Sequence, residues 1–373
     1  MDESSKQNIL FDIARGLAAL VVMFGHLRQF MFVSVPQIEN SSIIVKPFYF
    51  LTGFGHQAVM VFFVLSGYLI SQSIITSYQR NRFSIIRYSI SRLSRLWMVL
   101  IPCLILTYIF DSMGILFGDP GFYMGERVEV VSAPDVGVHD MGMQNFISNM
   151  FFLQTVTSST YGSNGPLWSL ANEFWYYVMF PLMFFIYTAK NYYIKIICVS
   201  ALVACIYFLP IIILELGLVW LAGVVAFLAR NMQWVKYTKY WLMRIFIVFM
   251  FFKSAVLYRT EVISDIEGEL YLAITFALIL LSCKEIVIRP AWLVKIITQI
   301  SDQSYTLYLF HFPFFAFLIG VIYGAERVQP SLINIVLYVG FAGAALYLSY
   351  MIYYLFERNT PIVRKKIMSI FNM

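Results

Sequence analysis

The sequence is poor in charged residues. Asp, Glu, Lys and Arg make up 12% of the 373 residues, whereas an ordinary soluble domain carries about 25%. Hydrophobic residues make up 60% of the chain. Because a chain of this length needs far more charge to cover a soluble fold, the composition excludes a soluble enzyme and a disordered protein. A polytopic membrane protein is the class that is left.

Cysteine is also scarce. The chain has four Cys, and they form neither a CxxC motif nor a cluster with His. This pattern excludes a zinc site and a disulfide framework, so we expect no metal. The formal net charge is +6, but in a membrane protein the positions of the charges matter more than their sum. We therefore expect no nucleic-acid partner.

Apolar segments recur along the whole chain. A membrane-spanning helix needs about 20 mostly apolar residues. Ten segments meet or approach this length: residues 9–33, 55–77, 96–117, 166–188, 192–209, 211–229, 240–258, 269–283, 303–323 and 332–356. The sequence predicts an all-α integral membrane protein, a bundle of about ten transmembrane helices. We expect one membrane-embedded domain over residues 1–373, surrounded by the lipid bilayer, with no appended soluble domain.

The basic residues indicate the orientation of these helices. With the N-terminus placed in the cytoplasm, 19 of the 26 Lys and Arg residues fall in inner segments and five in outer segments. Cytoplasmic loops of membrane proteins carry such an excess. We predict that the N- and C-termini are both cytoplasmic.

Two segments between predicted spans differ in composition from the other connections. Residues 79–95 alternate basic and apolar side chains, which predicts an interfacial helix on the inner surface. Residues 118–165 form a long, acidic outer loop that is rich in Gly, Pro and Asn. A loop of this length is more often functional than not.

The first predicted span contains Asp12, Arg15 and His26. Charged side chains within a membrane usually face a cavity or a partner. The spacing places Arg15 and His26 on one face of a helix, about 16 Å apart along its axis. Two interpretations stay open. Either Arg15 reaches the inner surface beside Asp12 while His26 is a core residue, or the face lines a cavity with an anion at its inner end and a base at its outer end.

The fourth predicted span carries Glu173 in its outer half, the half in which His26 also lies. A carboxylate beside a His is a common acid/base unit, because the carboxylate orients the ring and stabilises its protonated form. A capping carboxylate is the alternative for Glu173.

Two further motifs carry polar or small residues into apolar segments. His311 comes two residues before Pro313, so it is either functional or bonded to a helix carbonyl that the proline frees. Ser66 and Gly67 permit a close approach of two helix backbones, and packing alone also accounts for them.

Arg92 and Arg95 lie on one face of the inner basic segment. Arginine pairs of this kind suit a phosphate clamp. Control of the topology by positive charge is the alternative.

Taken together, these motifs resemble the acyltransferase family 3 of membrane O-acyltransferases. The matching motifs are Arg15-x10-His26 with Asp12 ahead of it, Phe62–Ile70 around Ser66 and Tyr68, the RxxR of Arg92 and Arg95, Trp168-Ser169-Leu170 with Glu173, and Ser304–Leu309 with Tyr305, followed by His311 and Pro313. They run in the family's order from residue 12 to residue 313.

The resemblance implies a multi-pass enzyme of the bacterial cytoplasmic (inner) membrane. It implies transfer of an acetyl or other acyl group from acetyl-CoA, or another acyl-CoA, to a hydroxyl of a surface glycan or lipid-linked sugar. The implied roles are His26 and Glu173 as catalytic residues, Arg15, Arg92 and Arg95 as acetyl-CoA-binding residues, and Asp12, Ser66, Tyr68, Trp168, Ser169, Tyr305 and His311 as substrate-binding or supporting residues.

Two other functions stay open at this point. Charged residues within spans also line the passage of a glycolipid transporter or flippase, and a non-catalytic scaffold needs no His and Glu pair. The sequence shows no repeated halves of the kind that transporters often have. It carries no prediction of the oligomeric state.

Overall fold

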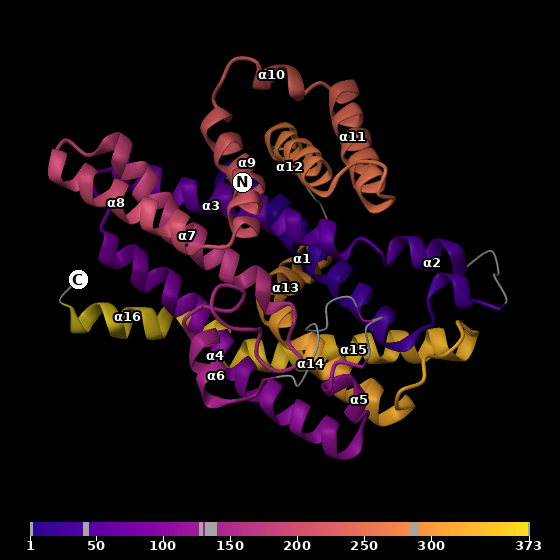
Figure 1. Ribbon diagram of the computed structural model, residues 1–373. Coiled ribbons are helices and arrows are strands. Elements are labelled where there is room, and N and C mark those ends of the chain that lie inside the picture. The colour runs from indigo at the N-terminus through magenta and orange to yellow at the C-terminus, as the bar shows by residue number, and fades with distance from the viewer. Residues whose placement is uncertain (1–2, 40–44, 127–129, 131–139, 284–289, 372–373) are drawn as a thin grey trace. The chain divides into compact units, whose positions relative to one another are not determined.

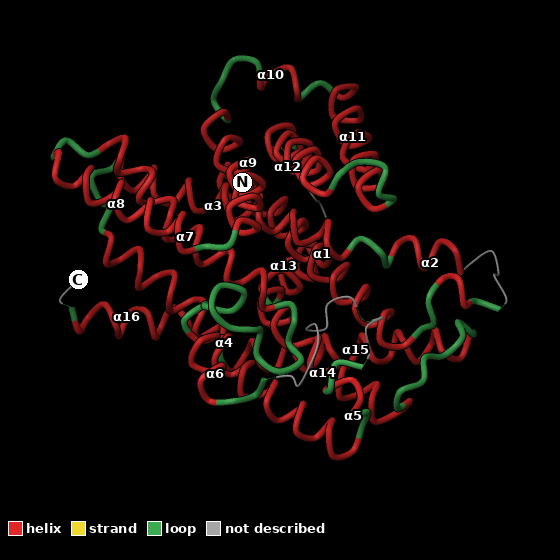
Figure 2. The backbone as a smooth tube through the Cα atoms, in the orientation of Figure 1, coloured by secondary structure: helices red, strands yellow, loops and turns green. Residues whose placement is uncertain are grey.

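The computed structural model describes residues 3–39, 45–126, 130, 140–283 and 290–371. Within these ranges the regular elements are helices, and no strand occurs (Figure 2). Figure 1 labels them along the chain. Their bounds are α1 (Glu3–Met31), η1 (Val35–Gln37), α2 (Val45–Leu51), α3 (Gly55–Gln79), α4 (Ile85–Phe117), α5 (Pro120–Tyr123), α6 (Met143–Met150), α7 (Leu167–Thr188), α8 (Tyr192–Phe208), α9 (Ile211–Ala229), α10 (Val235–Thr238), α11 (Trp241–Arg259), α12 (Asp265–Ser282), α13 (Ala291–Asp302), α14 (Ser304–Tyr323), α15 (Leu332–Leu355), η2 (Glu357–Asn359) and α16 (Thr360–Ile370).

Among the described residues, seven helical stretches are long and apolar enough to cross a membrane. They are Ile9–Met31, Val45–Gln79, Ile85–Phe117, Ile211–Ala229, Trp241–Arg259, Ser304–Tyr323 and Leu332–Ile370. Seven such helices are typical of a multi-pass membrane protein, and the all-α class is confirmed.

The other three predicted spans are also helical but less suited to a membrane. Helix α8 has 17 residues, and α12 carries Asp265, Glu267 and Glu269 in its first turns. Helix α7 contains Asn172 and Glu173 among its apolar residues. The count of about ten spans and the cytoplasmic termini therefore stay predictions.

The inner basic segment is part of the same helix as the predicted span that follows it, and its interfacial position stays a prediction. Residues 80–84 form a turn, and α4 then runs without a break from Ile85 to Phe117, through Pro102. No Gly or Pro separates the basic residues from the apolar run, so the helix continues from one into the other.

Contacts divide the chain into two compact units, and the division falls inside α1, α3, α4 and α7. Unit 1 comprises Met1–Phe11, Val59–Tyr88 and Ser169–Ile288, and unit 2 comprises Asp12–Ala58, Ser89–Trp168 and Arg289–Met373.

In unit 1, α12 packs against both α9 and α11. Helices α3 and α9 also approach each other closely. A Cβ on Gly67 would collide with the backbone of Trp220, and a Cβ on Gly223 would collide with the carbonyl of Val64. Glycines therefore let these two backbones touch, as small residues do in membrane bundles.

In unit 2, α14 forms the centre of the packing and lies against α15. Its residues Leu307, Leu309, Phe312 and Phe315 are fully buried. The polar side chains of unit 2 are arranged around this helix.

The outer loop 118–165 is only partly covered, because residues 127–129 and 131–139 lie outside the described residues. The described part contains the short helices α5 and α6. Its last residues lead directly into α7 and pack beside α14.

Candidate active site

Two histidines lie in contact inside unit 2. Nδ1 of His26, on α1, lies 2.7 Å from Nε2 of His311, on α14. The two rings are almost parallel, with 6° between their planes. His26 is 8% exposed and His311 is fully buried. The sequence singled out both residues but did not predict their contact.

The hydrogen bonds of His311 determine which nitrogen of each neutral ring carries the proton. Nδ1 of His311 lies 2.8 Å from the carbonyl oxygen of Leu307. A carbonyl only accepts, so Nδ1 of His311 donates and its Nε2 accepts. Nδ1 of His26 must then be the donor to His311. The lone pair of His26 is therefore on Nε2, the atom that can take a proton from a hydroxyl.

Pro313 disturbs the helix just beyond His311. It has no N–H, so the carbonyl of Leu309 loses its helical donor. Nδ2 of Asn164 donates to this carbonyl at 2.9 Å. The carbonyl that the proline frees is thus bonded to Asn164, whereas His311 bonds to Leu307.

The loop that carries Asn164 is itself held by a buried carboxylate. The backbone N–H and the hydroxyl of Ser163 each donate to Asp111 at 2.6 Å. Gly162 has a φ of 54°, and a Cβ there would collide with Asp111. This turn therefore needs glycine. Asp111 and Asn164 were not predicted from the sequence, although Asp111 within an apolar run is a signal that points to a buried partner.

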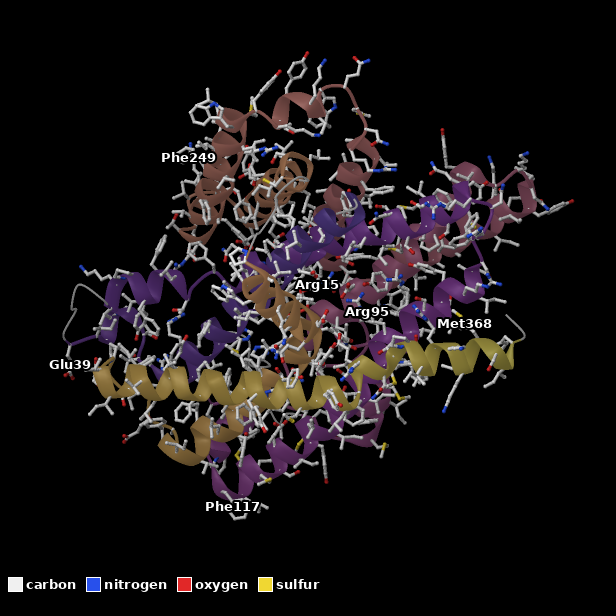
Figure 3. All side chains as sticks on the ribbon, turned by 180° about the vertical axis from the view of Figure 1, so that it is seen from behind. Arg15, Glu39, Arg95, Phe117, Phe249 and Met368 are labelled. Atoms are coloured by element: carbon white, nitrogen blue, oxygen red, sulfur yellow. The ribbon has the colours of Figure 1, made fainter. Side chains whose placement is uncertain are left out.

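A cluster of charged residues surrounds Arg15 in unit 2. Arg15 interacts electrostatically with Arg95, Asp12, Asp302 and Glu357. The side chains of Arg15 and Arg95 lie near each other in Figure 3. The cluster thus contains two arginines and three carboxylates. A bound anion can take the place of a carboxylate as the partner of these arginines.

Hydroxyl groups hold two of these carboxylates. Ser301 donates to Oδ1 of Asp12 at 2.9 Å, and Thr306 donates to Oε2 of Glu357 at 2.6 Å. Glu357 was not predicted from the sequence. The sequence signal that could have identified Glu357 is its position at the end of a long apolar helix, next to Arg358.

Asp302, which was not predicted either, ends α13. Burial raises the pKa of its carboxyl group, Asp12 raises that pKa further, and Arg15 lowers it. The charged form of Asp302 is therefore less favourable here than in water and depends on the positive charge of Arg15.

The arrangement of α1 and α14 gives the polar groups of unit 2 an order along the helix axes. Ser301, just before α14, bonds to Asp12 near the start of the α1 segment in unit 2. Phe32 pairs with Val328 just beyond the ends of the two helices. The two helices therefore run in the same direction, and the histidine pair lies between the Arg15 cluster and these helix ends.

Arg92 lies one helical turn before Arg95 and is half-buried. Arg95 is an electrostatic partner of Arg15. The role of Arg92 as the second arm of a phosphate clamp stays a prediction.

Glu173 belongs to a hydroxyl cluster in unit 1. Its Oε1 accepts from Ser66 at 2.8 Å and from the hydroxyl of Tyr177. Trp220 donates from its ring N–H to the oxygen of Ser66 at 3.2 Å. The structure thus joins the predicted residues Ser66 and Glu173. The pairing of Glu173 with His26 stays a prediction.

The remaining predicted residues make local contacts. The ring of Trp168 stacks on His56, with 6.0 Å between centroids. Tyr305 donates to the carbonyl of Leu96 at 3.2 Å. Tyr68 is buried and packs between Phe11 and Phe227, and Ser169 is buried. These contacts are structural, and the substrate roles of the four residues stay predictions.

No group of three or more His, Cys, Asp or Glu side chains within the described ranges is arranged to hold a metal ion. The groups with evident chemistry are the histidine pair, the Arg15 cluster and the carboxylate of Glu173.

Comparison with known proteins shows which family and which relatives the chain is similar to. The model of a protein family described as an acyltransferase domain (the acyltransferase 3 family) matches residues 8–354. An O-acetyl transferase of Shigella phage Sf6 is 33% identical over 178 residues, which are 45% of this chain and 44% of the phage protein. An uncharacterized protein of Haemophilus influenzae is 28% identical over 147 residues, 38% of this chain and 55% of that protein. The aligned regions thus span about half of these relatives. No solved structure matches the chain significantly.

Proposed function

Because the chain belongs to the acyltransferase 3 family, we propose that it is a membrane O-acetyltransferase that takes its acetyl group from acetyl-CoA. The proposed acceptor is a hydroxyl of a surface glycan or a lipid-linked sugar, and the proposed location is the bacterial cytoplasmic membrane. The name of the phage relative, an O-acetyl transferase, supports the acetyl group and the ester product.

The Arg15 cluster is the proposed site for the phosphates of acetyl-CoA. Coenzyme A carries several phosphate charges on a long thin arm, and arginine binds phosphate well because its planar group donates two hydrogen bonds at once. Arg15 and Arg95 interact electrostatically, so both can contact one ligand. Arg92 is the proposed third contact. From this end the arm reaches along α1 toward His26.

His26 is the proposed general base. Its Nε2 takes the proton of the acceptor hydroxyl while the hydroxyl oxygen attacks the thioester carbonyl. The C–S bond then breaks, and Nε2 returns the proton to the departing thiolate of coenzyme A. A base held in this way typically contributes about 10²- to 10⁴-fold to the rate.

His311 supports this cycle as a positioning residue. When His26 is protonated, its Nδ1–H donates to Nε2 of His311 more strongly, since a hydrogen bond from a charged donor is stronger than one from a neutral donor. The bond from His311 to Leu307 keeps the acceptor nitrogen in place. Glu173, bonded to Ser66 and Tyr177, remains the proposed supporting carboxylate of the reaction.

The observation that carries the proposal is the lone pair on Nε2 of His26, fixed by the contact with His311. The test is release of free coenzyme A from acetyl-CoA by the purified protein, with and without a lipid-linked glycan, beside the variant His26→Ala. We expect acceptor-dependent release that the variant loses while it still binds coenzyme A. Full turnover in a folded His26→Ala protein would contradict the mechanism.

A further inference from the structure

The chain segments that leave the two histidine helices meet again beyond the helix ends. Phe32 and Val328 form a β-bridge. The N–H of Val33 donates to the carbonyl of Val328 at 3.2 Å, and the N–H of Val328 donates to the carbonyl of Met31 at 2.9 Å. The segment after α1 and the segment after α14 therefore form one connected surface in unit 2.

This surface is hollowed by a pocket of about 730 Å³, lined by Val33, Ser34, Pro36, Gln37, Ala325 and Arg327. We call it the Arg327 pocket. Its volume is within the range of about 300–1,000 Å³ that is common for small-molecule sites. Gln37, one of the lining residues, comes two positions before Glu39, which is labelled in Figure 3.

The polar groups of the Arg327 pocket suit a ligand rich in hydroxyls. The guanidinium of Arg327 lies 3.1 Å from the hydroxyl oxygen of Ser34 and 3.4 Å from the amide oxygen of Gln37. A guanidinium, a hydroxyl and an amide together offer both donors and acceptors within one small area. Sugar hydroxyls need this mixture, because each both donates and accepts.

The walls of the pocket are held in place by hydrogen bonds from outside it. Tyr49 donates to the carbonyl of Val33 at 2.7 Å, and Nε2 of Gln329 donates to the carbonyl of Gln37 at 2.9 Å. Asn334 donates to the carbonyl of Gln329 at 2.9 Å. The pocket is therefore preformed, which lowers the cost of ordering on binding.

The pocket is also near the proposed base along the helix axis. Helix α1 ends at Met31, about 8 Å of helix rise beyond His26. The Arg15 cluster lies on the other side of His26 along the same helix. A donor bound at Arg15 and an acceptor bound in the pocket would thus approach His26 from opposite ends.

We propose that the Arg327 pocket binds the acceptor glycan through the sugar units next to the one that receives the acetyl group. This inference rests on the proposed function and assigns the acceptor a place in the fold. It predicts that the pocket controls the affinity for an oligosaccharide and leaves the chemical step unchanged.

The test uses two variants that damage the pocket in different ways. Arg327→Ala removes the charged donor, and Ala325→Trp fills the space without removing a hydrogen bond. Lys46→Ala is the control, because Lys46 is an exposed cation of the same unit that does not line the pocket.

The probe is the polysaccharide of the bacterium that carries the protein, freed of its O-acetyl groups by mild base and supplied as its oligosaccharide repeat and as the separate monosaccharides. Acetyl transfer from radiolabelled acetyl-CoA is measured against probe concentration. We expect Arg327→Ala to raise KM for the oligosaccharide about tenfold, the loss typical of one hydrogen bond to a charged group. We expect Ala325→Trp to raise KM at least as much, because the indole fills the space that the sugar needs. We expect kcat, coenzyme A binding and the KM of Lys46→Ala to stay within about twofold of wild type, a difference of about 0.4 kcal/mol.

The outcomes separate the two proposals. Wild-type protein that transfers acetyl groups, with an unchanged KM in both pocket variants, would overturn the pocket and keep the function. A similar rise in KM for Lys46→Ala would show general attraction by positive charge and would also overturn it. Wild-type protein that transfers no acetyl group to any probe would contradict the proposed function itself.

Discussion

Nδ1 of His26 donates a hydrogen bond to Nε2 of His311, 2.7 Å away and across the interface of α1 and α14. The direction of this bond follows from the bond between His311 and the Leu307 carbonyl. His311, which is 285 positions away in the sequence, thus fixes the orientation of the His26 imidazole. The proposed positioning role of His311 can therefore be tested with a series of variants.

Replacing His311 is expected to lower kcat more than it changes substrate binding. In His311→Ala the Nδ1–H of His26 loses its acceptor, so the ring can turn or change tautomer, and kcat should fall about 10²-fold. His311→Gln keeps an acceptor oxygen and should retain more activity than the Ala variant. The measurement is kcat and KM for acetyl-CoA in both variants.

The pH profile provides the control for this series. A positioning role predicts that the pH dependence of kcat shifts in His311→Ala and returns toward wild type in His311→Gln. Equal losses in the two variants with an unchanged profile would indicate a purely structural role for His311.

Replacing Arg15 or Arg95 is expected to weaken the binding of acetyl-CoA. In the proposed site each arginine donates a charge-assisted hydrogen bond to phosphate, so its loss should raise the Kd for coenzyme A about tenfold or more. Lysine at either position keeps the charge but loses the two-pronged geometry, and should restore binding in part. The measurement is the Kd for coenzyme A at several salt concentrations.

Arg259→Ala, which removes a cation at the end of α11 in unit 1, is the matched control for the arginine series. An equal loss of affinity in this variant would show that overall positive charge, and not the Arg15 cluster, attracts the ligand.

Much of the fold was open to prediction from the sequence. Long apolar runs are a strong signal, and seven of the ten predicted spans correspond to helices that are apolar and long enough to cross a membrane. The spans at 192–209 and 269–283 are weaker because α8 is short and α12 begins with acidic residues. Most of the basic segment is helical, as predicted, and is continuous with the next apolar run; its position at the membrane surface stays a prediction, since charge patterning alone does not show where a helix ends.

The site was harder to predict than the fold. His26, His311 and Arg15 stand out because polar side chains are rare in apolar helices. Their contacts depend on which helices pack together, and no local signal gives that. Asn164 and Arg327 lie in polar connecting segments, where one more polar residue is not conspicuous.

The bond between Asn164 and Leu309 gives a stability prediction. Asn164→Ala should leave the buried Leu309 carbonyl without its side-chain donor and destabilise the protein by about 1–3 kcal/mol. Pro313→Ala restores a backbone N–H four residues after Leu309. The double variant should therefore be more stable than Asn164→Ala alone. The measurement is thermal unfolding in detergent for all four proteins of the cycle.

Additive effects of the two substitutions would contradict this account. The cycle detects coupling only if the two groups share the same carbonyl, since separate sites add within about 0.5 kcal/mol.

The close approach of α3 and α9 gives a second stability prediction. Gly67→Ala places a methyl group against the backbone of Trp220. The backbone cannot move aside as a flexible side chain can, so the helices must separate, and we expect the free energy of unfolding to fall by about 1–3 kcal/mol.

Gly343→Ala is the matched control, because a Cβ at Gly343 meets no described atom within 4 Å. It should be neutral or slightly stabilising, since alanine favours the helix. Thermal unfolding of the two variants in the same detergent decides the matter. An equal loss in both would show that the cost comes from glycine replacement within membrane helices in general and not from the contact of α3 with α9.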